Sequence, residues 1–237
     1  MLKSVKVRIQ KFFAALGLLS FELIVVLLLF LLAVSTFGFF VKQIFIDDQV
    51  AFDQKVFEWL ATRVTPFNTE FMEFITFLGT HTFLIPANLV LLTWFLLVRK
   101  HRWYSIKVVA IALSSTALMF VLKNFFSRER PLIPLLEPAL GYSFPSGHSL
   151  MSFSFYGLLI FLSYKNFRHP LVKWLVITSL VILILLIGFS RIYLRVHYFS
   201  DVLAGFAVGI AWLIFSIWLL NKIERYSKRN IEPVLEE

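Results

Sequence analysis

Long apolar runs constrain the fold of this chain more than any other feature of its sequence. Several of them reach the roughly 20 residues that an α-helix needs to cross a bilayer. Of the 237 residues, 59% are hydrophobic and only 16% are charged, whereas about a quarter of the residues in soluble domains are charged. The sequence therefore predicts an all-α, polytopic membrane protein.

Hydropathy predicts six transmembrane helices, joined by loops too short to hold another domain. The predicted spans are residues 17–41, 72–98, 104–122, 149–164, 171–190 and 199–221. The fourth span is short and depends on neighbouring helices for its burial. The first run is longer than the hydrophobic region of a signal peptide, so we interpret it as an uncleaved span rather than a cleaved leader.

The segment between the first two spans, residues 42–71, is acidic and mixed in composition. Its side chains fall on separate faces at helical spacing: Phe52, Val56, Trp59 and Leu60 on one, and Asp53, Lys55, Glu58 and Arg63 on the others. This pattern is typical of an amphipathic helix that lies in the membrane interface. An ordinary soluble hairpin is the less favoured alternative.

Three polar clusters interrupt the apolar sequence, and each lies at the edge of a predicted span. They occupy residues 123–131, 145–148 and 190–201. Helices that alternate in direction bring all three clusters to the same face of the membrane. Together the clusters hold basic residues, a Ser-Gly pair that opens a helix and two histidines, which are the groups needed to hold a phosphate and hydrolyse it.

Lysine and arginine residues divide unequally between the two sides of the predicted helices. Fifteen fall on the side of both termini and eight on the other side, and five of those eight belong to the polar clusters. Because cytoplasmic segments carry the excess of Lys and Arg, we predict a multi-pass protein of the cell membrane with both termini in the cytoplasm. The polar clusters then emerge on the external or periplasmic face.

The first two clusters contain groups that suit an anion. Arg130 can contact phosphate oxygens in a bidentate manner, whereas Lys123 acts as a point charge. Residues 145–148 directly precede the fourth span and should form the first turn of that helix, where unpaired backbone N–H groups attract anions. Gly147 lets the backbone approach a phosphate, and Ser146 caps the helix, donates to the phosphate, or does both.

The third cluster adds Arg191 and a histidine paired with a carboxylate. His197 and Asp201 are four residues apart, which in a helix places them on one face, about 6 Å apart along the axis. The carboxylate can accept from one imidazole nitrogen and leave the other as a nucleophile, as Asp does for His in a hydrolytic triad. A lone His-x-x-x-Asp is often only a salt-bridged helix surface, but three clusters on one face favour the functional interpretation.

The three clusters resemble the three-part motif of the type 2 phosphatidic acid phosphatase family, which shares its catalytic core with vanadium haloperoxidases and bacterial acid phosphatases. The matching patterns are Lys123-x6-Arg130-Pro131, Pro145-Ser146-Gly147-His148 and Ser190-Arg191-x5-His197-x3-Asp201. The similarity spans roughly residues 72–220 and also covers Thr76-x-Leu78-Gly79 and Val202-Leu203-Ala204-Gly205. One departure is Arg195, where many members carry glycine.

The resemblance implies a metal-independent phosphohydrolase that needs no cofactor and forms a phosphohistidine intermediate. The implied substrate is a membrane lipid phosphate of the phosphatidate, phosphatidylglycerol phosphate or polyprenyl diphosphate type. By this resemblance His197 is the nucleophile, Asp201 orients it, and His148 protonates the leaving group and then activates water. Phosphate binding is implied for Lys123, Arg130, Ser146, Gly147 and Arg191.

The same reading divides the chain into three parts. Residues 1–71 hold the first span and the interfacial segment, residues 72–221 form the catalytic domain, and residues 222–237 form a cytoplasmic tail that is expected to fray. Within the spans, Glu22, His81 and Asn88 are interpreted as groups that snorkel or bond to neighbouring helices rather than as ligands.

Other functions fit the sequence less well. A lipid-to-lipid phosphotransferase stays open because it would share every motif, whereas a non-catalytic headgroup-binding or transport protein would be signalled by loss of a motif histidine or aspartate. Membrane embedding and the lack of large soluble insertions argue against a haloperoxidase. The basic residues behind the net charge of +9 form no single patch, which argues against nucleic acid. The absence of cysteine excludes disulfides and thiolate chemistry.

Overall fold

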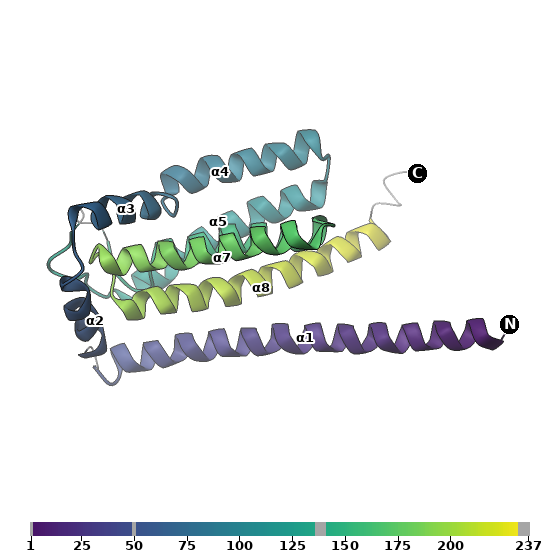
Figure 1. Ribbon diagram of the computed structural model, residues 1–237, viewed down its shortest axis with the longest axis horizontal. Coiled ribbons are helices and arrows are strands. Elements are labelled where there is room, and N and C mark those ends of the chain that lie inside the picture. The colour runs from purple at the N-terminus through teal and green to yellow at the C-terminus, as the bar shows by residue number, and fades with distance from the viewer. Residues whose placement is uncertain (1, 49–50, 136–140, 232–237) are drawn as a thin grey trace.

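The structure, a computed structural model, describes residues 2–48, 51–135 and 141–231, and gives no side-chain detail for residues 2–20 and 22. Glu137, which lies in the sequence between the first and second polar clusters, and the side chain of Glu22 are therefore outside the described residues. Within those limits the chain is a bundle of helices without any strand (Figure 1). The predicted all-α membrane fold is confirmed.

Eight α-helices and one π-helical turn make up the described chain. They are α1 (Leu2–Phe45), α2 (Ala51–Ala61), α3 (Pro66–Phe77), α4 (His81–Thr93), η1 (Trp94–Val98), α5 (Arg102–Phe126), α6 (Gly147–Asn166), α7 (Pro170–Tyr193) and α8 (Phe199–Asn230). Among the described residues, five segments are long and apolar enough to cross a membrane: Leu23–Phe45, His81–Val98, Arg102–Phe126, Pro170–Tyr193 and Phe199–Asn230. These segments correspond to five of the six predicted spans.

Helix α6, the predicted fourth span, does not reach the hydropathy of the other five. It packs against α5, α7 and α8, and these neighbours bury many of its side chains. Ser149, Ser152 and Ser154 lie among the buried ones. Because protein rather than lipid surrounds it, α6 tolerates polar residues that a lipid-facing helix would not.

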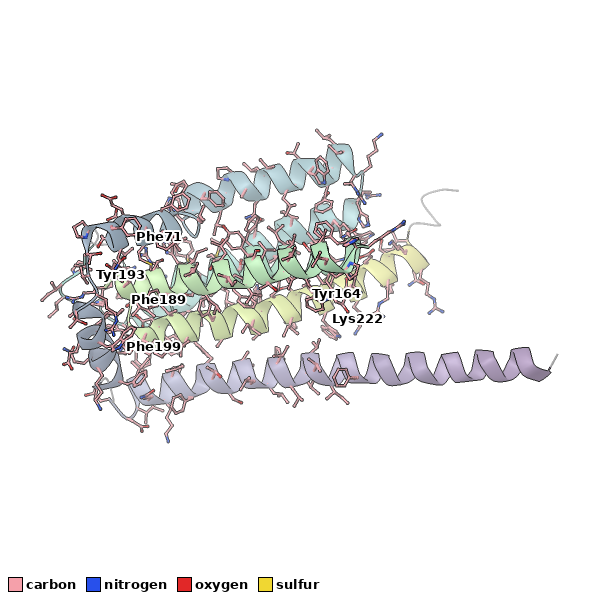
Figure 2. All side chains as sticks on the ribbon, viewed as in Figure 1. Phe71, Tyr164, Phe189, Tyr193, Phe199 and Lys222 are labelled. Carbon is pink, nitrogen blue, oxygen red and sulfur yellow. The ribbon has the colours of Figure 1, made fainter. Side chains whose placement is uncertain are left out.

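The helices alternate in direction, so their connections gather at two ends of the bundle. The start of α1 and the end of α8 lie at one end, and α2 lies at the other (Figure 1). Tyr193 and Phe199 mark the α2 end, whereas Tyr164 and Lys222 mark the opposite one (Figure 2). The ends of α5 and α7 and the starts of α6 and α8 therefore bring the three polar clusters together at the α2 end, as the sequence predicts.

The predicted second span, 72–98, is divided in the structure. Helix α3 ends at Phe77, and Thr80 caps the start of α4 by accepting from the backbone N–H of Phe83 at 3.4 Å. The prediction ran through this turn because its residues are as apolar as the helices around them. His81 is therefore an exposed residue of the first turn of α4 rather than a group inside a span.

Two smaller expectations also change. The amide of Asn88 donates to the Leu84 carbonyl of its own helix at 2.8 Å, and no bond from it to another helix is seen among the described residues. Helix α8 continues to Asn230, so the segment from Lys222, which was expected to fray, begins as helix.

Helix α2 forms within the segment for which an amphipathic helix was predicted. Leu60 is buried, and Phe52 and Trp59 are about half exposed. Asp53 departs from the prediction: the helical pattern put it on a polar face, but it is only 4% exposed.

Candidate active site

His197 lies in the short connection between α7 and α8, enclosed by the bundle. The side chain is 2% exposed. Its Nδ1 lies 3.5 Å from Asp201 Oδ2 and 3.3 Å from Ser143 Oγ. Its Nε2 lies on the side of Arg130, 3.4 Å from Nη1 of that guanidinium. One ring nitrogen thus faces a carboxylate and a hydroxyl, and the other faces a cation.

Asp201 occupies the first turn of α8 and is fully buried. Its Oδ2 accepts from the backbone N–H of Tyr198 at 2.9 Å and from the Ser143 hydroxyl. Because Ser143 donates its proton to the carboxylate, its oxygen is available to accept from Nδ1–H of His197. Ser143 therefore links the Asp201 carboxylate to Nδ1 of His197 through hydrogen bonds. This arrangement favours the His197 tautomer that carries its proton on Nδ1 and its lone pair on Nε2.

Residues 145–148 form the opening of α6, as the sequence predicts. Ser146 is the N-cap and accepts from the backbone N–H of Ser149 at 3.4 Å. Its own backbone N–H donates to the carbonyl of Asp201 at 3.0 Å. Ser146 thus fills the capping role that the sequence left open, and it ties the start of α6 to the start of α8.

Gly205 allows these two helix starts to meet. A Cβ atom at this position would lie 2.6 Å from the backbone oxygen of Ser146 and 2.9 Å from Cβ of Ser149. Any side chain here would push α8 away from α6. The contact fixes the turn that carries His148 against the turn that carries Asp201.

His148 lies in the first turn of α6 and points toward the turn between α3 and α4. A Cβ atom on Gly79 would lie 3.2 Å from Cδ2 of the His148 ring. The Nε2 atom of His148 is buried and has no hydrogen-bond partner within the described part of the chain. This nitrogen is free to exchange a proton with a bound group.

Three basic side chains predicted to bind phosphate come together around the histidines. Lys123 donates from Nζ to the Tyr142 carbonyl. Arg130 donates to the carbonyls of Gly141 and Val196 at 2.8 and 2.7 Å. The bond to Tyr142 leaves part of the hydrogen-bonding capacity of Lys123 for an anion, because a lysine ammonium group has three donors.

Arg191, at the end of α7, is the most enclosed of the three bases. It is 3% exposed and donates from Nη1 to Thr76 Oγ1 of α3 at 2.7 Å. Its Nε is buried without a partner among the residues that the structure describes. Thr76 is the first residue of the Thr76-x-Leu78-Gly79 pattern noted in the sequence. Its contact with Arg191 explains why a threonine suits this position.

The electrostatics of the site keep His197 neutral. Burial lowers the pKa of His197 well below its ordinary value, and the positive charges of Lys123, Arg191 and Arg130 lower it further. A neutral imidazole at pH 7 has a lone pair to attack with. The same charges that would hold a phosphate therefore also keep the ring in its reactive form.

A family model described as the PAP2 superfamily matches residues 103–225, which carry all three motifs. The chain belongs to the PAP2 superfamily. This confirms the family to which the sequence motifs pointed. The candidate site lies at one end of the helices that the family model covers. Helices α2, α3 and α4 precede the matched residues.

Named relatives within the PAP2 superfamily are similar over most of the chain. Phosphatidylglycerophosphatase B of Bacillus subtilis (strain 168) is 31% identical over 168 residues, which cover 69% of this chain and 81% of that protein. Undecaprenyl-diphosphatase of Sulfolobus acidocaldarius is 27% identical over 216 residues, 86% of this chain and 96% of that protein.

A solved PAP2 structure has the same helical fold. It is the crystal structure of the first transmembrane PAP2 type phosphatidylglycerolphosphate phosphatase from Bacillus subtilis. The match has a TM-score of 0.73 and 28% identity, and covers 82% of this chain and 98% of that one. This chain therefore has the fold of a membrane PAP2 protein.

Arg195, the departure from the PAP2 pattern, has a conformation that explains why glycine would suit the position. Its φ is 54°, in the left-handed region that glycine adopts without strain. Its Nε is buried and has no partner among the described residues. An arginine in this sequence therefore holds a left-handed position two residues before His197.

Sequence reasoning did not connect Ser143 or Asp53 with the candidate site and gave no role to Arg128. Ser143 lies two residues before the Pro145–His148 pattern and carries no spacing signal of its own. Arg128 was counted only as one of the basic residues of the first cluster. Asp53 lies outside the region matched by the family model, and only the three-dimensional structure brings it to Arg128.

Proposed function

We propose that this chain is an integral-membrane lipid phosphate phosphohydrolase that acts through a phosphohistidine on His197. One observation carries the proposal: His197 has Ser143 and Asp201 at Nδ1 and the Arg130 cation at Nε2. A ring held in this way is a nucleophile aimed at the place where a phosphate would be bound. The names of the relatives support a lipid phosphate, either a phospholipid monophosphate or a polyprenyl diphosphate.

In the first step, the Nε2 lone pair of His197 attacks phosphorus, and the bond between phosphorus and the ester oxygen breaks. The leaving oxygen takes a proton from His148, whose imidazolium form the negative charge of the bound phosphate stabilises. Lys123, Arg130 and Arg191 offset the charge on the three equatorial oxygens, with N–H groups of the α6 first turn. The products are the lipid alcohol, or the lipid monophosphate from a diphosphate, and N-phosphorylated His197.

In the second step, water attacks the phosphohistidine. Neutral His148 accepts the proton of the incoming water, and the bond between phosphorus and Nε2 breaks. Inorganic phosphate leaves, and His197 returns to its neutral form while His148 is again protonated. Asp201 stabilises the positive charge that develops on the His197 ring, as the aspartate of a hydrolytic triad does.

Purified protein is expected to release inorganic phosphate from a panel of lipid monophosphates and diphosphates in the presence of EDTA. Among the described residues no group of three or more His, Asp or Glu side chains is placed to hold a metal ion, and Asp201 is already bonded to Arg128, Ser143 and Tyr198. Vanadate, which adopts the trigonal-bipyramidal geometry of phosphoryl transfer, should block release. Phosphate release that stops on chelation and returns with Mg²⁺ would contradict the phosphohistidine mechanism.

We further propose that both termini are cytoplasmic and that the site faces the external or periplasmic side. The fifteen-to-eight division of basic residues supports this orientation. The fold is compatible with it, because the start of α1 and the end of α8 lie at the end of the bundle away from the site (Figure 1). In this orientation the residues after Lys222 extend into the cytoplasm.

Topology reporters provide the test. A reporter fused after Lys165, at the end of α6, or at the C-terminus should be active in the cytoplasm. A reporter inserted at Glu137 should be active outside. A cytoplasmic signal at Glu137 would invert the orientation and place the site on the inner face.

A further inference from the structure

A buried ionic network joins helix α2 to the candidate active site. Asp53 Oδ2 accepts from Arg128 Nη2 at 2.9 Å and from the Ser200 hydroxyl at 2.6 Å. Asp53 Oδ1 accepts from the Ser200 backbone N–H at 2.9 Å. Carboxylates are rarely buried unless they are paired, so the burial of Asp53 depends on partners from outside its own helix.

Arg128 is the middle member of this network. Its Nη1 donates to Asp201 Oδ1 at 2.6 Å and to the Ser200 hydroxyl at 2.9 Å, and its guanidinium lies 4.0 Å over the Tyr198 ring. Burial disfavours its charge, but the carboxylates of Asp201 and Asp53 raise the pKa of Arg128 above its ordinary value. A planar guanidinium that bonds two carboxylates fixes their relative positions.

The two oxygens of Asp201 have different tasks. Oδ2 faces His197 and Ser143, whereas Oδ1 is held by Arg128. The bond to Oδ1 sets the rotation of the carboxylate about its Cβ–Cγ axis. Together with the bonds from Tyr198 and Ser143 to Oδ2, it directs Oδ2 toward the Nδ1 side of His197.

Asp53 also sets the charge of the network. Two carboxylates and one guanidinium give the network itself one net negative charge. Without Asp53, the Arg128 cation would pair with Asp201 alone and offset the charge with which Asp201 polarises the imidazole.

We propose that Asp53 is a positioning residue for the phosphatase reaction, which holds Arg128 so that Asp201 presents its carboxylate to His197. This inference rests on the proposed function, because it assigns α2 a part in the same site. Helix α2, the amphipathic helix between the first two spans, then contributes a positioning residue to the catalytic site.

A buried ion pair at the other end of the bundle provides a matched control. Lys107 of α5 is 2% exposed and donates to Glu224 of α8 at 2.6 Å. This pair also joins two helices through a buried charge, but it lies far along α5 and α8 from Arg128 and Asp201. Loss of Glu224 should therefore cost stability without changing the chemistry.

The experiment measures the rate constant and the amplitude of phosphoenzyme formation by rapid quench, with p-nitrophenyl phosphate labelled in the phosphoryl group. The full-length variants are Asp53→Asn, Asp201→Asn, the double variant, and Glu224→Gln as the control. The amplitude reports the fraction of folded, active protein, and the rate constant reports the positioning of the reacting groups. Thermal unfolding in detergent records any loss of stability.

Asp53→Asn is expected to lower the rate constant about 10- to 100-fold, the range lost when partners that orient metal-bound histidines are removed. In the Asp201→Asn background, the same change should alter the rate constant less than about threefold, because the residue through which Asp53 acts has already lost its charge. Glu224→Gln should leave the rate constant unchanged even where it lowers the unfolding temperature.

An unchanged rate constant in Asp53→Asn, or an equal loss in both backgrounds, would overturn the inference and leave the proposed function intact. A wild-type protein that forms no phosphoenzyme would overturn both. If Asp53→Asn does not fold, Ser200→Ala replaces it, since this change removes one hydrogen bond from Asp53 and one from Arg128. It should slow phosphorylation several-fold at full amplitude, and a full-rate Ser200→Ala enzyme would count against the inference.

Discussion

His197→Ala is expected to abolish phosphoenzyme formation and turnover for every substrate. The alanine removes the only atom that the mechanism allows to bond with phosphorus, so no leaving group can compensate. Loss of the nucleophile from a hydrolytic triad costs roughly 10⁶-fold in kcat, and a loss of that order should be seen here. Steady-state phosphate release and rapid-quench labelling measure the two effects.

The matched control for this variant is His169→Ala. His169 precedes α7 at the opposite end of the bundle and its side chain makes no capping bond. This variant should label and turn over like the wild type. Labelling that persists in His197→Ala but vanishes in His148→Ala would exchange the roles of the two site histidines.

His148→Ala is expected to affect substrates according to their leaving groups. A lipid alkoxide needs a proton to depart, so turnover on lipid phosphates should fall by about 10²- to 10⁴-fold, the range of general acid catalysis. An activated phenol such as p-nitrophenol departs without that proton. Phosphoenzyme should therefore still form from p-nitrophenyl phosphate.

The same variant should accumulate the intermediate, because in the proposed mechanism His148 also activates the incoming water. The measurement is the decay of labelled protein after a chase with unlabelled substrate. Equal losses of phosphorylation rate on the lipid phosphate and on p-nitrophenyl phosphate would remove His148 from the role of general acid.

Much of the candidate site could be predicted from the sequence because each motif is local. The opening of α6 is a run of four residues, and His197 and Asp201 are only four positions apart in the sequence. Their pairing does not need the single helix that the sequence predicted, because His197 precedes α8 and only Asp201 lies in it. The hydrophobic pattern then supplied the remaining information, since helices of alternating direction bring the ends of α5 and α7 to one side. The apolar spans next to each motif were therefore enough to predict that the motifs meet at one end of the bundle.

The division of the predicted second span had no comparable signal. Leu78 and Gly79 are apolar, and hydropathy does not distinguish a turn from a helix in such a stretch. Thr80 stabilises the turn by capping α4 and by donating its hydroxyl to the Phe77 carbonyl. The hydroxyl of Tyr156, 78 positions further along the chain, donates to the Leu78 carbonyl at 2.8 Å. Contacts over such separations are not visible in a local pattern.

The burial of Asp53 could not be predicted from the sequence for the same reason. A carboxylate on an amphipathic helix is normally solvated, and nothing within residues 42–71 indicates otherwise. Its partner Arg128 is 75 positions away. Ser143 likewise reaches Asp201 across 58 positions, so its role depended on the packing of α8 against the loop before α6.

The most direct test of the central claim is to identify the residue that carries the phosphoryl group. Wild-type protein is quenched during turnover of a labelled lipid phosphate in EDTA, digested under alkaline conditions and mapped by mass spectrometry. The proposed mechanism predicts an acid-labile phosphoryl group on the His197 ring that disappears at the rate of phosphate release. A label on any other residue, or phosphate release without a labelled protein, would contradict it.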